Sequence, residues 1–392
     1  MTTITPVPIP TTDPAPSAED ELLARAALAG ADLAPGVAER DRTGDLPAVV
    51  VDRLRAAGLT TMLVPADNGG GGHTHEAAGA ALRALAAHDP ATAVTLSMHT
   101  HLVAQQVWRH HQGLDASAVF AKVVDGAFLV STGASDWLGS SGTARRVDGG
   151  YRVTARKAPA SGCEVGQVAV TSVRWDDAPD GPSVLHCSIP LSAEGVSIER
   201  TWDTLGLRAT GSHTIVFDEV FVPDAAVPLV RPADVWHPVW TVVVAAAMPL
   251  IMAAYVGIAD AAVEAALALC DGRDDPATVQ ALGAMANAHV TAEDGLAGMF
   301  VAAEDLRFAA TDALAGRVLA RKTVVADAVI ATVRLAIEAV GGRAYGRTSD
   351  LERLLRDVHG ANVHPLPRTR QLLVTGRVAL GLGPVEATEA RR

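Results

Sequence analysis

The sequence has few cysteines, few aromatic residues and fewer basic than acidic residues. Its three cysteines are scattered over 392 residues with no Cys-x-x-Cys pair, which excludes a disulfide framework and a cysteine-based zinc site and favours a reduced, cytoplasmic location. Aromatic residues make up 4% of the chain, so Ala, Val and Leu must fill the core, as in closely packed helices. The formal net charge of −12 argues against a nucleic-acid partner, which requires a basic surface.

The common catalytic motifs are missing too. The chain has no Gly-x-Ser-x-Gly, no Walker phosphate loop, no His-Glu-x-x-His and no Gly-x-Gly-x-x-Gly after a predicted strand. His99 and His101 are two residues apart on a predicted helix, so they face different sides and cannot chelate one metal ion. We therefore predict no metal site.

Two segments bear on targeting and membranes. Residues 1–17 are rich in Thr and Pro without an apolar run, so we interpret them as a disordered tail rather than a signal peptide. Residues 238–259 carry no charge and are long enough to span a bilayer, but Pro249 interrupts them and no basic cluster flanks them. We favour a helix buried in a bundle over a membrane span.

The hydrophobic period divides the chain into three regions. Residues 18–126 have a helical period, residues 127–234 alternate with a period of two and many turns, and residues 235–392 are helical again. In the middle region, residues 143–155 with the turn at Asp148-Gly149-Gly150 predict a β-hairpin. The predicted fold is α+β and mostly α: an N-terminal helical domain, a middle antiparallel β domain and a C-terminal helical bundle. In the last region we expect helices over 240–270, 278–314, 318–340, 349–359 and 368–382.

Several runs of residues occur in a characteristic order. They are Phe-Leu-Val-Ser-Thr-Gly-Ala-Ser-Asp at 128–136, Gly-Gly-Tyr-Arg-Val-Thr-Ala-Arg-Lys at 149–157, Trp-Asp-Thr-Leu-Gly-Leu-Arg-Ala-Thr-Gly-Ser at 202–212, Val-Phe-Asp-Glu-Val-Phe-Val-Pro at 216–223, Glu-Ala-Val-Gly-Gly-Arg-Ala-Tyr at 338–345 and Leu-Glu-Arg-Leu-Leu-Arg-Asp at 351–357. Their order and spacing cover most of the chain and resemble the acyl-CoA dehydrogenase superfamily.

The resemblance implies a flavin, FAD or FMN, at the junction of the β domain and the C-terminal bundle. Ser131, Thr132, Ser135 and Ser161 match positions that contact the flavin ring in that family. A rotatable hydroxyl at Ser161 could serve flavin N5 in both redox states, because N5 changes from acceptor to donor on reduction. The resemblance also implies a cofactor role for Gly341 and Gly342, where glycine allows close backbone approach, although a helix C-cap explains them equally well.

Two positions at which the sequence departs from the family pattern indicate which reaction the protein catalyses. Dehydrogenases of this family remove an α-proton with a Glu, but that position matches Pro365 here, and the alternative position near residues 236–240 has no Glu either. Proline cannot ionise, so that route is closed. The flavin monooxygenases of the family, such as dibenzothiophene monooxygenase, resemble the chain instead, with His99, Ser161 and His364 at the matching positions. Oxygen chemistry at a reduced flavin needs a dry pocket, hydrogen-bond donors and a group that relays a proton.

A second departure concerns the cofactor tail and the partners. Residues 274–283 lack the Phe-Gly pair that contacts the FAD pyrophosphate in the dehydrogenases. This leaves FMN, or a reduced flavin delivered by a separate flavin reductase, as an alternative to FAD, and no NAD(P)H site is visible. We expect a small-molecule substrate and a homodimer or homotetramer formed through the bundle.

Three functions remain open from the sequence. We predict a flavin-dependent monooxygenase with His99, His364 and Ser161 as catalytic residues. The first alternative is an acyl-CoA dehydrogenase with a different base, and the second is a non-catalytic protein that binds flavin or an acyl thioester. For His364, the following proline disfavours helical backbone, so we expect the ring to project from a rigid extended turn.

Overall fold

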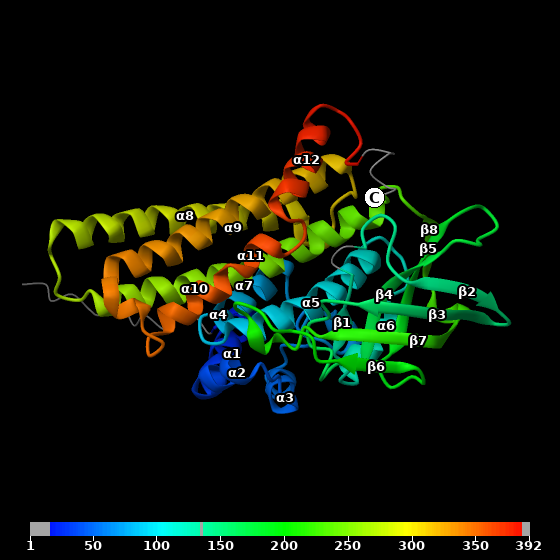
Figure 1. Ribbon diagram of the computed structural model, residues 1–392, viewed down its shortest axis with the longest axis horizontal. Coiled ribbons are helices and arrows are strands. Elements are labelled where there is room, and N and C mark those ends of the chain that lie inside the picture. The colour runs from blue at the N-terminus through cyan, green and yellow to red at the C-terminus, as the bar shows by residue number, and fades with distance from the viewer. Residues whose placement is uncertain (1–15, 134–135, 386–392) are drawn as a thin grey trace, which may run out of the picture.

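A computed structural model describes residues 16–133 and 136–385. A long helical bundle and a β-sheet lie side by side, and the N-terminal helices pack against the bundle next to the sheet (Figure 1). The architecture confirms the predicted order of helices, β-sheet and helical bundle.

The N-terminal helices begin where capping residues predict. Thr74 accepts a hydrogen bond from the Ala77 amide at the start of α4, and Asp89 accepts one from the Thr92 amide at the start of α5, with Pro90 as its first residue. The helices of this region are α1 (Ala18–Leu33), α2 (Val37–Thr43), α3 (Ala48–Ala56), α4 (His75–Ala86), α5 (Pro90–His111) and α6 (Ser117–Val124).

The middle region forms one eight-stranded sheet in the order β6-β7-β3-β2-β4-β5-β8, with β1 paired to β4. The predicted hairpin is present, because β2 and β3 pair antiparallel across the turn at Asp148 and Gly149. The sheet is not wholly antiparallel: β1 runs parallel to β4, and β2 pairs parallel with the far end of β4. The strands are β1 (Leu129–Ser131), β2 (Thr143–Val147), β3 (Gly150–Lys157), β4 (Val168–Trp175), β5 (Ser183–Pro190), β6 (Val196–Glu199), β7 (Thr214–Pro223) and β8 (Leu229–Pro232).

The C-terminal bundle differs from the prediction at one helix. The helix expected over 278–314 ends at Ala303, because Glu304 and Asp305 adopt left-handed backbone conformations (φ 46° and 47°) that stop it. No glycine or proline marks that end in the sequence. The helices are α7 (Pro238–Leu269), α8 (Pro276–Ala303), α9 (Asp312–Val340), α10 (Asp350–Val358), α11 (Gly360–Val363) and α12 (Arg368–Ala379).

Helix α7 is the apolar centre of the molecule. Among the described residues it is the one helix that by length and composition could cross a membrane, and 94% of its most apolar window is buried inside the protein. It packs against α4 and α5 on one side and against α8, α9 and α10 on the other. This matches the buried-helix interpretation, since a helix that is apolar all round needs neighbours on every face.

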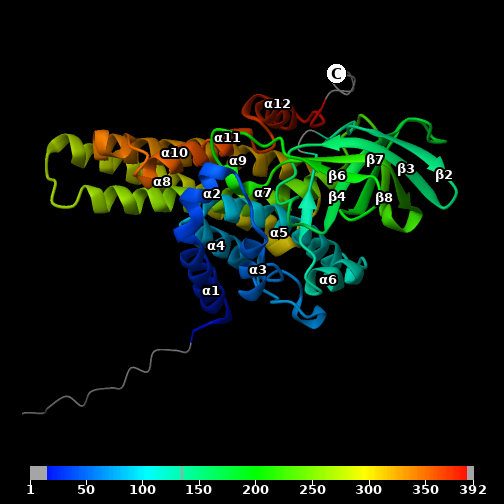
Figure 2. The same cartoon turned by 60° about the horizontal axis from the view of Figure 1, so that its bottom comes forward.

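The two largest apolar cores among the described residues are separate from each other. The larger core joins the N-terminal helices to the bundle, and the smaller one lies within the sheet. Figure 2 shows the sheet standing against one end of α5 and α7. This junction positions the candidate site.

Candidate functional site

A cavity opens at the junction of α5, α7 and the sheet. Helix α7 supplies an apolar wall that includes Val243, Met248 and Ile251. No carboxylate lines the cavity within residues 16–133 and 136–385. Its polar lining consists of imidazoles, hydroxyls and one amide, from His101, Gln105, Ser131, Thr132, Ser161, Thr171, Ser172, His186 and His364.

The structure brings three of the predicted flavin-contacting residues to this cavity. Ser131 ends β1, Thr132 follows it and donates a hydrogen bond to Thr171 Oγ1 (2.6 Å), and Ser161 faces them from the loop after β3. Ser135 lies outside the described residues. Ser131 and Thr132 of the run at 128–136 thus line the cavity, and their contact with a flavin stays a prediction.

Gly341 and Gly342 do not reach the cavity. They follow α9 at the end of the bundle farthest from the sheet (Figure 1). Gly341 has a positive φ of 77° and ends the helix, and both residues are exposed. Within this chain they have the geometry of the helix C-cap that the sequence left open as the alternative.

His364 lines the cavity in the backbone conformation that Pro365 predicts. Its φ of −55° and ψ of 137° are extended, and its ring lies edge-on to Tyr255. Nδ1 lies 2.6 Å from the Tyr255 hydroxyl. Burial, followed by the nearby charge of Lys322, lowers the pKa of His364 to about 3, so the ring is neutral near pH 7.

Lys322 fixes the turn that carries His364. This buried side chain of α9 donates to the carbonyl oxygens of Ala361 (2.8 Å) and Leu366 (3.3 Å), on either side of the histidine. Burial lowers the pKa of Lys322 to about 8. No pattern in the sequence marks Lys322, because a lysine that will be buried in a helix has the same local sequence features as a lysine on the surface.

The structure does not bring His99 to the cavity. Its Nε2 donates to the Thr60 carbonyl (2.8 Å), its Nδ1 accepts from the Leu129 amide (2.9 Å), and its ring stacks on Phe128. Both ring nitrogens are thus occupied by backbone groups, and burial lowers the pKa to about 4. The prediction that His99 lies beside Ser161 and His364 is therefore wrong. His99 instead joins β1 to the segment between α3 and α4, and neither of its ring nitrogens is free to contact a ligand.

His101 takes the place that was expected for His99. Its Nδ1 donates to the Ser97 carbonyl (3.2 Å), which leaves Nε2 as a hydrogen-bond acceptor, and the ring lines the cavity. Burial lowers its pKa to about 4, so it is also neutral near pH 7. The two histidines lie on one helix, and the sequence alone could not say which of the two faces the sheet.

A third imidazole, missed in the sequence, lines the cavity from β5. His186 Nε2 accepts from Arg231 Nε (3.0 Å), and burial together with the Arg231 charge lowers the pKa of His186 to about 3. Arg231 is buried against the Trp240 ring (5.4 Å), and Trp240 stacks on Trp137 (5.4 Å). This cluster gives the cavity a rigid aromatic wall.

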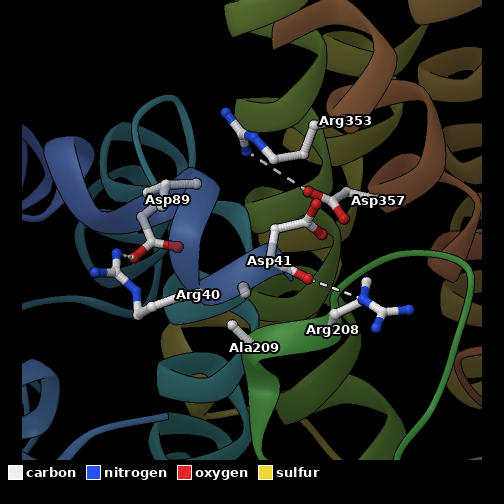
Figure 3. Close-up of a pocket in the computed structure, with 9 residues that line it drawn as sticks. Arg40, Asp41, Asp89, Arg208, Ala209, Arg353 and Asp357 are labelled. Carbon is white, nitrogen blue, oxygen red and sulfur yellow. Dashed lines mark hydrogen bonds and ion pairs between the residues drawn. The ribbon is translucent and has the colours of Figure 1, made fainter. Parts of the chain in front are cut away.

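A smaller, ionic cavity is lined by residues of α2, the start of α5, the 203–211 loop and α10 (Figure 3). Arg40 pairs with Asp89 (2.6 Å), and Arg353 approaches Asp357 (3.7 Å). Asp357 is buried, which raises its pKa to about 6, and its Oδ1 accepts the Leu207 amide (2.6 Å). The Leu207 bond joins the loop to α10, and the pair of Arg356 with Asp41 (2.7 Å) joins α10 to α2.

One cluster of metal-ligand type occurs elsewhere among the described residues. Asp260, His289 and Glu293 lie close enough for one ion, but Arg83 pairs with Asp260 (2.5 Å) and with Glu293 (2.6 Å). Because Arg83 contacts both carboxylates and His289 Nε2 lies 2.6 Å from Asp260, this cluster has the geometry of an ion-pair network between α4, α7 and α8.

Two family models match the chain, and together they cover more than half of it. The N-terminal domain of acyl-CoA dehydrogenase matches residues 18–112, and the C-terminal domain of acyl-CoA dehydrogenase matches residues 250–368. The chain belongs to the acyl-CoA dehydrogenase superfamily. It is thus a flavin-dependent oxidoreductase of that superfamily, with the fold described above.

Relatives with different chemistries match nearly the whole chain. YdbM of Bacillus subtilis, provisionally named an acyl-CoA dehydrogenase, is 28% identical over 84% of this chain and 88% of its own length. The amino sugar nitrososynthase DnmZ of Streptomyces peucetius is 29% identical over 88% and 89%. The structure of KijD3 in complex with FMN and a dTDP-linked amino keto sugar superposes with a TM-score of 0.84, at 26% identity over 95% and 96% of the two chains.

Two monooxygenases match a smaller part. Dibenzothiophene monooxygenase of Rhodococcus qingshengii is 28% identical over 47% of this chain and 46% of its own. HsaA of Rhodococcus jostii, named as the oxygenase subunit of a flavin-dependent monooxygenase, is 29% identical over 57% and 64%. The superfamily members similar to this chain thus include oxygenases.

The residues of the cavity fit a flavin. Its hydroxyls can exchange hydrogen bonds with a ring that carries both donors and acceptors. The indole N–H group of Trp240, which lines the cavity, is buried without a hydrogen-bond partner in the described part of the chain, so it is available to an acceptor on a bound molecule. The apolar wall of α7 would cover a flat ring and exclude water.

Proposed function

We propose that this protein is a flavin-dependent monooxygenase that uses reduced flavin and O2 to oxidise a small organic substrate. The observation that carries the proposal is the composition of the cavity: His101, Ser161 and His364 line one space, and no described carboxylate does. Removal of an α-proton from an acyl thioester in this family requires a carboxylate base, and the position that would supply it is Pro365, itself in the cavity wall.

The two histidines offer complementary groups to a ligand. The Tyr255 hydroxyl makes no other hydrogen bond to the described residues, so it donates to His364 Nδ1 and leaves the ring proton of His364 on Nε2. His101 has the opposite tautomer, with its proton on Nδ1 and a free lone pair on Nε2. His364 can therefore donate a hydrogen bond in the cavity while His101 accepts one, and both rings are neutral near pH 7.

The cofactor is FMN or FAD held by Ser131, Thr132 and Ser161, and it would supply the electrons that activate O2. KijD3, which is similar over 95% of this chain, binds FMN. The related HsaA is an oxygenase subunit, which supports a separate flavin reductase as the partner of this protein. Assembly as a homodimer or homotetramer is part of the same proposal.

The proposal is tested by mixing the protein, loaded with chemically reduced FMN under nitrogen, with oxygenated buffer in a stopped-flow spectrometer. We expect a transient absorbance phase before reoxidation that free FMN does not show. His364→Ala should shorten or abolish that phase, whereas His359→Ala, a histidine outside the cavity, should leave it unchanged.

The dehydrogenase alternative keeps one supporting observation, the match to YdbM. It is tested with oxidised flavin on the protein and butyryl-CoA or palmitoyl-CoA without oxygen. Bleaching of the flavin by either thioester would replace the monooxygenase proposal. Flavin that binds but responds neither to oxygen in a protein-dependent way nor to thioesters would indicate a non-catalytic binding protein.

A further inference from the structure

Three hydroxyl groups form a hydrogen-bonded chain that leads away from the cavity. Ser161 Oγ lies 2.8 Å from Ser212 Oγ, and Ser212 Oγ lies 2.6 Å from Thr210 Oγ1. Thr210 Oγ1 lies 2.9 Å from the carbonyl oxygen of Leu207. Ser161 lines the cavity, whereas Ser212 and Thr210 are buried behind it.

The carbonyl at the end of the chain sets the direction of all three bonds. A carbonyl oxygen only accepts, so Thr210 uses its single proton on Leu207. Ser212 must then donate to Thr210, and Ser161 must donate to Ser212. These three hydroxyls make no further hydrogen bonds to the described residues. Each hydroxyl has one proton and each of the three contacts needs one, so this arrangement is the only one in which every contact is a hydrogen bond.

Leu207, whose carbonyl ends this series of hydrogen bonds, is held in place by its surroundings. Leu207 has a positive φ of 53°, a conformation that a leucine adopts only when its surroundings impose it. Its amide donates to the buried carboxylate of Asp357 (2.6 Å), in the ionic cluster of Figure 3. The Gly162 amide also donates to the Thr210 carbonyl (2.9 Å), which joins the Ser161 loop to the same segment.

We propose that Ser212 and Thr210 are positioning residues that make Ser161 a hydrogen-bond acceptor toward the cavity, so that the protein binds reduced flavin more tightly than oxidised flavin. The inference rests on the proposed flavin site. N5 of reduced flavin carries a proton and can donate, whereas N5 of oxidised flavin accepts. The freely rotating Ser161 hydroxyl expected from the sequence would serve both states, and the directed chain favours the reduced one.

The experiment compares the dissociation constants of oxidised and reduced FMN, with the reduced form measured under nitrogen. We expect the wild-type protein to prefer reduced FMN. In Ser212→Ala the Ser161 proton is released to the cavity, so the preference should shrink about threefold to tenfold, the effect of one ordinary hydrogen bond. A tenfold change equals about 30 mV in the two-electron midpoint potential of the bound flavin.

Matched variants separate positioning from general damage. Ser212→Thr keeps the hydroxyl and should keep the preference. Thr201→Val removes a similar hydroxyl pair, Thr201 with Thr214 (2.8 Å), outside the cavity, and should also keep it. If Ser212→Ala does not fold, Thr210→Val interrupts the same chain one hydroxyl further on and should lose the preference.

The binding measurements distinguish failure of this inference from failure of the proposed function. A wild-type protein that binds oxidised FMN as tightly as reduced FMN, or a folded Ser212→Ala with an unchanged ratio, overturns the inference while leaving the monooxygenase proposal intact. Failure to bind FMN and FAD in either redox state overturns both.

Discussion

The Tyr255 hydroxyl on α7 and Nδ1 of His364 after α11 are 2.6 Å apart, although 109 residues separate them in the chain. Burial raises the pKa of Tyr255 well above its usual value, so the hydroxyl keeps its proton, and Nδ1 is the one acceptor it contacts among the described residues. The contact therefore fixes both the orientation and the tautomer of the imidazole.

We predict that His364→Ala keeps the fold and flavin binding but lowers turnover by roughly 10²–10⁴-fold, as expected on loss of a general acid–base group. Steady-state oxygenation assays with a fixed supply of reduced flavin measure this, beside a flavin titration of the same variant. Near-normal turnover would rule out the role of His364.

Tyr255→Phe should have a milder effect on the same step. The variant removes one hydrogen bond and frees the ring to exchange tautomers, so we expect turnover to fall by about threefold to tenfold. Because the Tyr255 ring still packs beside His364, stability should change little. A Tyr255→Phe variant as inactive as His364→Ala would instead point to direct contact of the tyrosine with substrate.

His99 and His101 should respond in opposite ways. His99→Ala leaves the Thr60 carbonyl and the Leu129 amide without partners in the core, so we expect a loss of about 2–4 kcal/mol in the free energy of unfolding. His101→Ala removes a cavity group and should lower turnover while costing less stability. Urea titrations and oxygenation assays on both variants decide the assignment, and a reversed pattern would return the catalytic role to His99.

The buried histidines predict acid sensitivity. His75, His99 and His101 are fully enclosed, and burial lowers the pKa of each to about 4. Between pH 6.5 and about 4 these histidines are protonated in the unfolded chain but neutral in the folded protein. The free energy of unfolding therefore falls as the pH falls, by about 1.4 kcal/mol per pH unit for each histidine. Asp357 acts in the opposite direction below about pH 6, because its pKa is raised. It is one group against five, since His186 and His364 have pKa values lowered to about 3 and add to the effect of these three histidines.

Urea denaturation at pH 7 and pH 5 measures this dependence, and we expect several kcal/mol less stability at pH 5. His75→Gln offers a control outside the flavin cavity, since an amide can still donate to the Ala246 carbonyl that His75 Nε2 contacts (2.9 Å). This variant should lose about a fifth of the pH dependence, because His75 is one of five histidines whose pKa is lowered by burial to about 3 or 4. A flat stability profile would contradict the neutral state of these rings.

Local signals predicted much of the fold, and contacts between distant segments explain most of the differences. Thr74 and the Asp148-Gly149 turn act within a few residues, so the start of α4 and the β2–β3 hairpin could be predicted. The parallel pairing of β1 with β4 joins residues about 40 positions apart and has no local signature. The end of α8 lies at Glu304, a residue type that seldom takes a left-handed conformation, so nothing in the sequence marks it.

Some residues of the candidate site could likewise be predicted from local sequence, whereas others depend on contacts between distant segments. Ser161 and His364 follow closely after the recognisable runs at 149–157 and 351–357, and the structure brings both to one cavity. The choice between His99 and His101 depended on which face of α5 meets the sheet, which tertiary packing alone decides. Lys322 and Ser212 act through a backbone carbonyl and through another hydroxyl, and such indirect roles leave no pattern in a sequence.

The apolar core that includes Leu22 of α1 also includes Val374 of α12, and α7 runs through its middle. A chain emerging from the ribosome therefore cannot complete this core until nearly its last helix has been made. Until then the uncharged first half of α7 has no finished surface to cover it and is open to aggregation or to capture by a chaperone. Once assembled, the helices from both ends of the chain should melt in a single transition, because neither group can keep its apolar surface from water without the other.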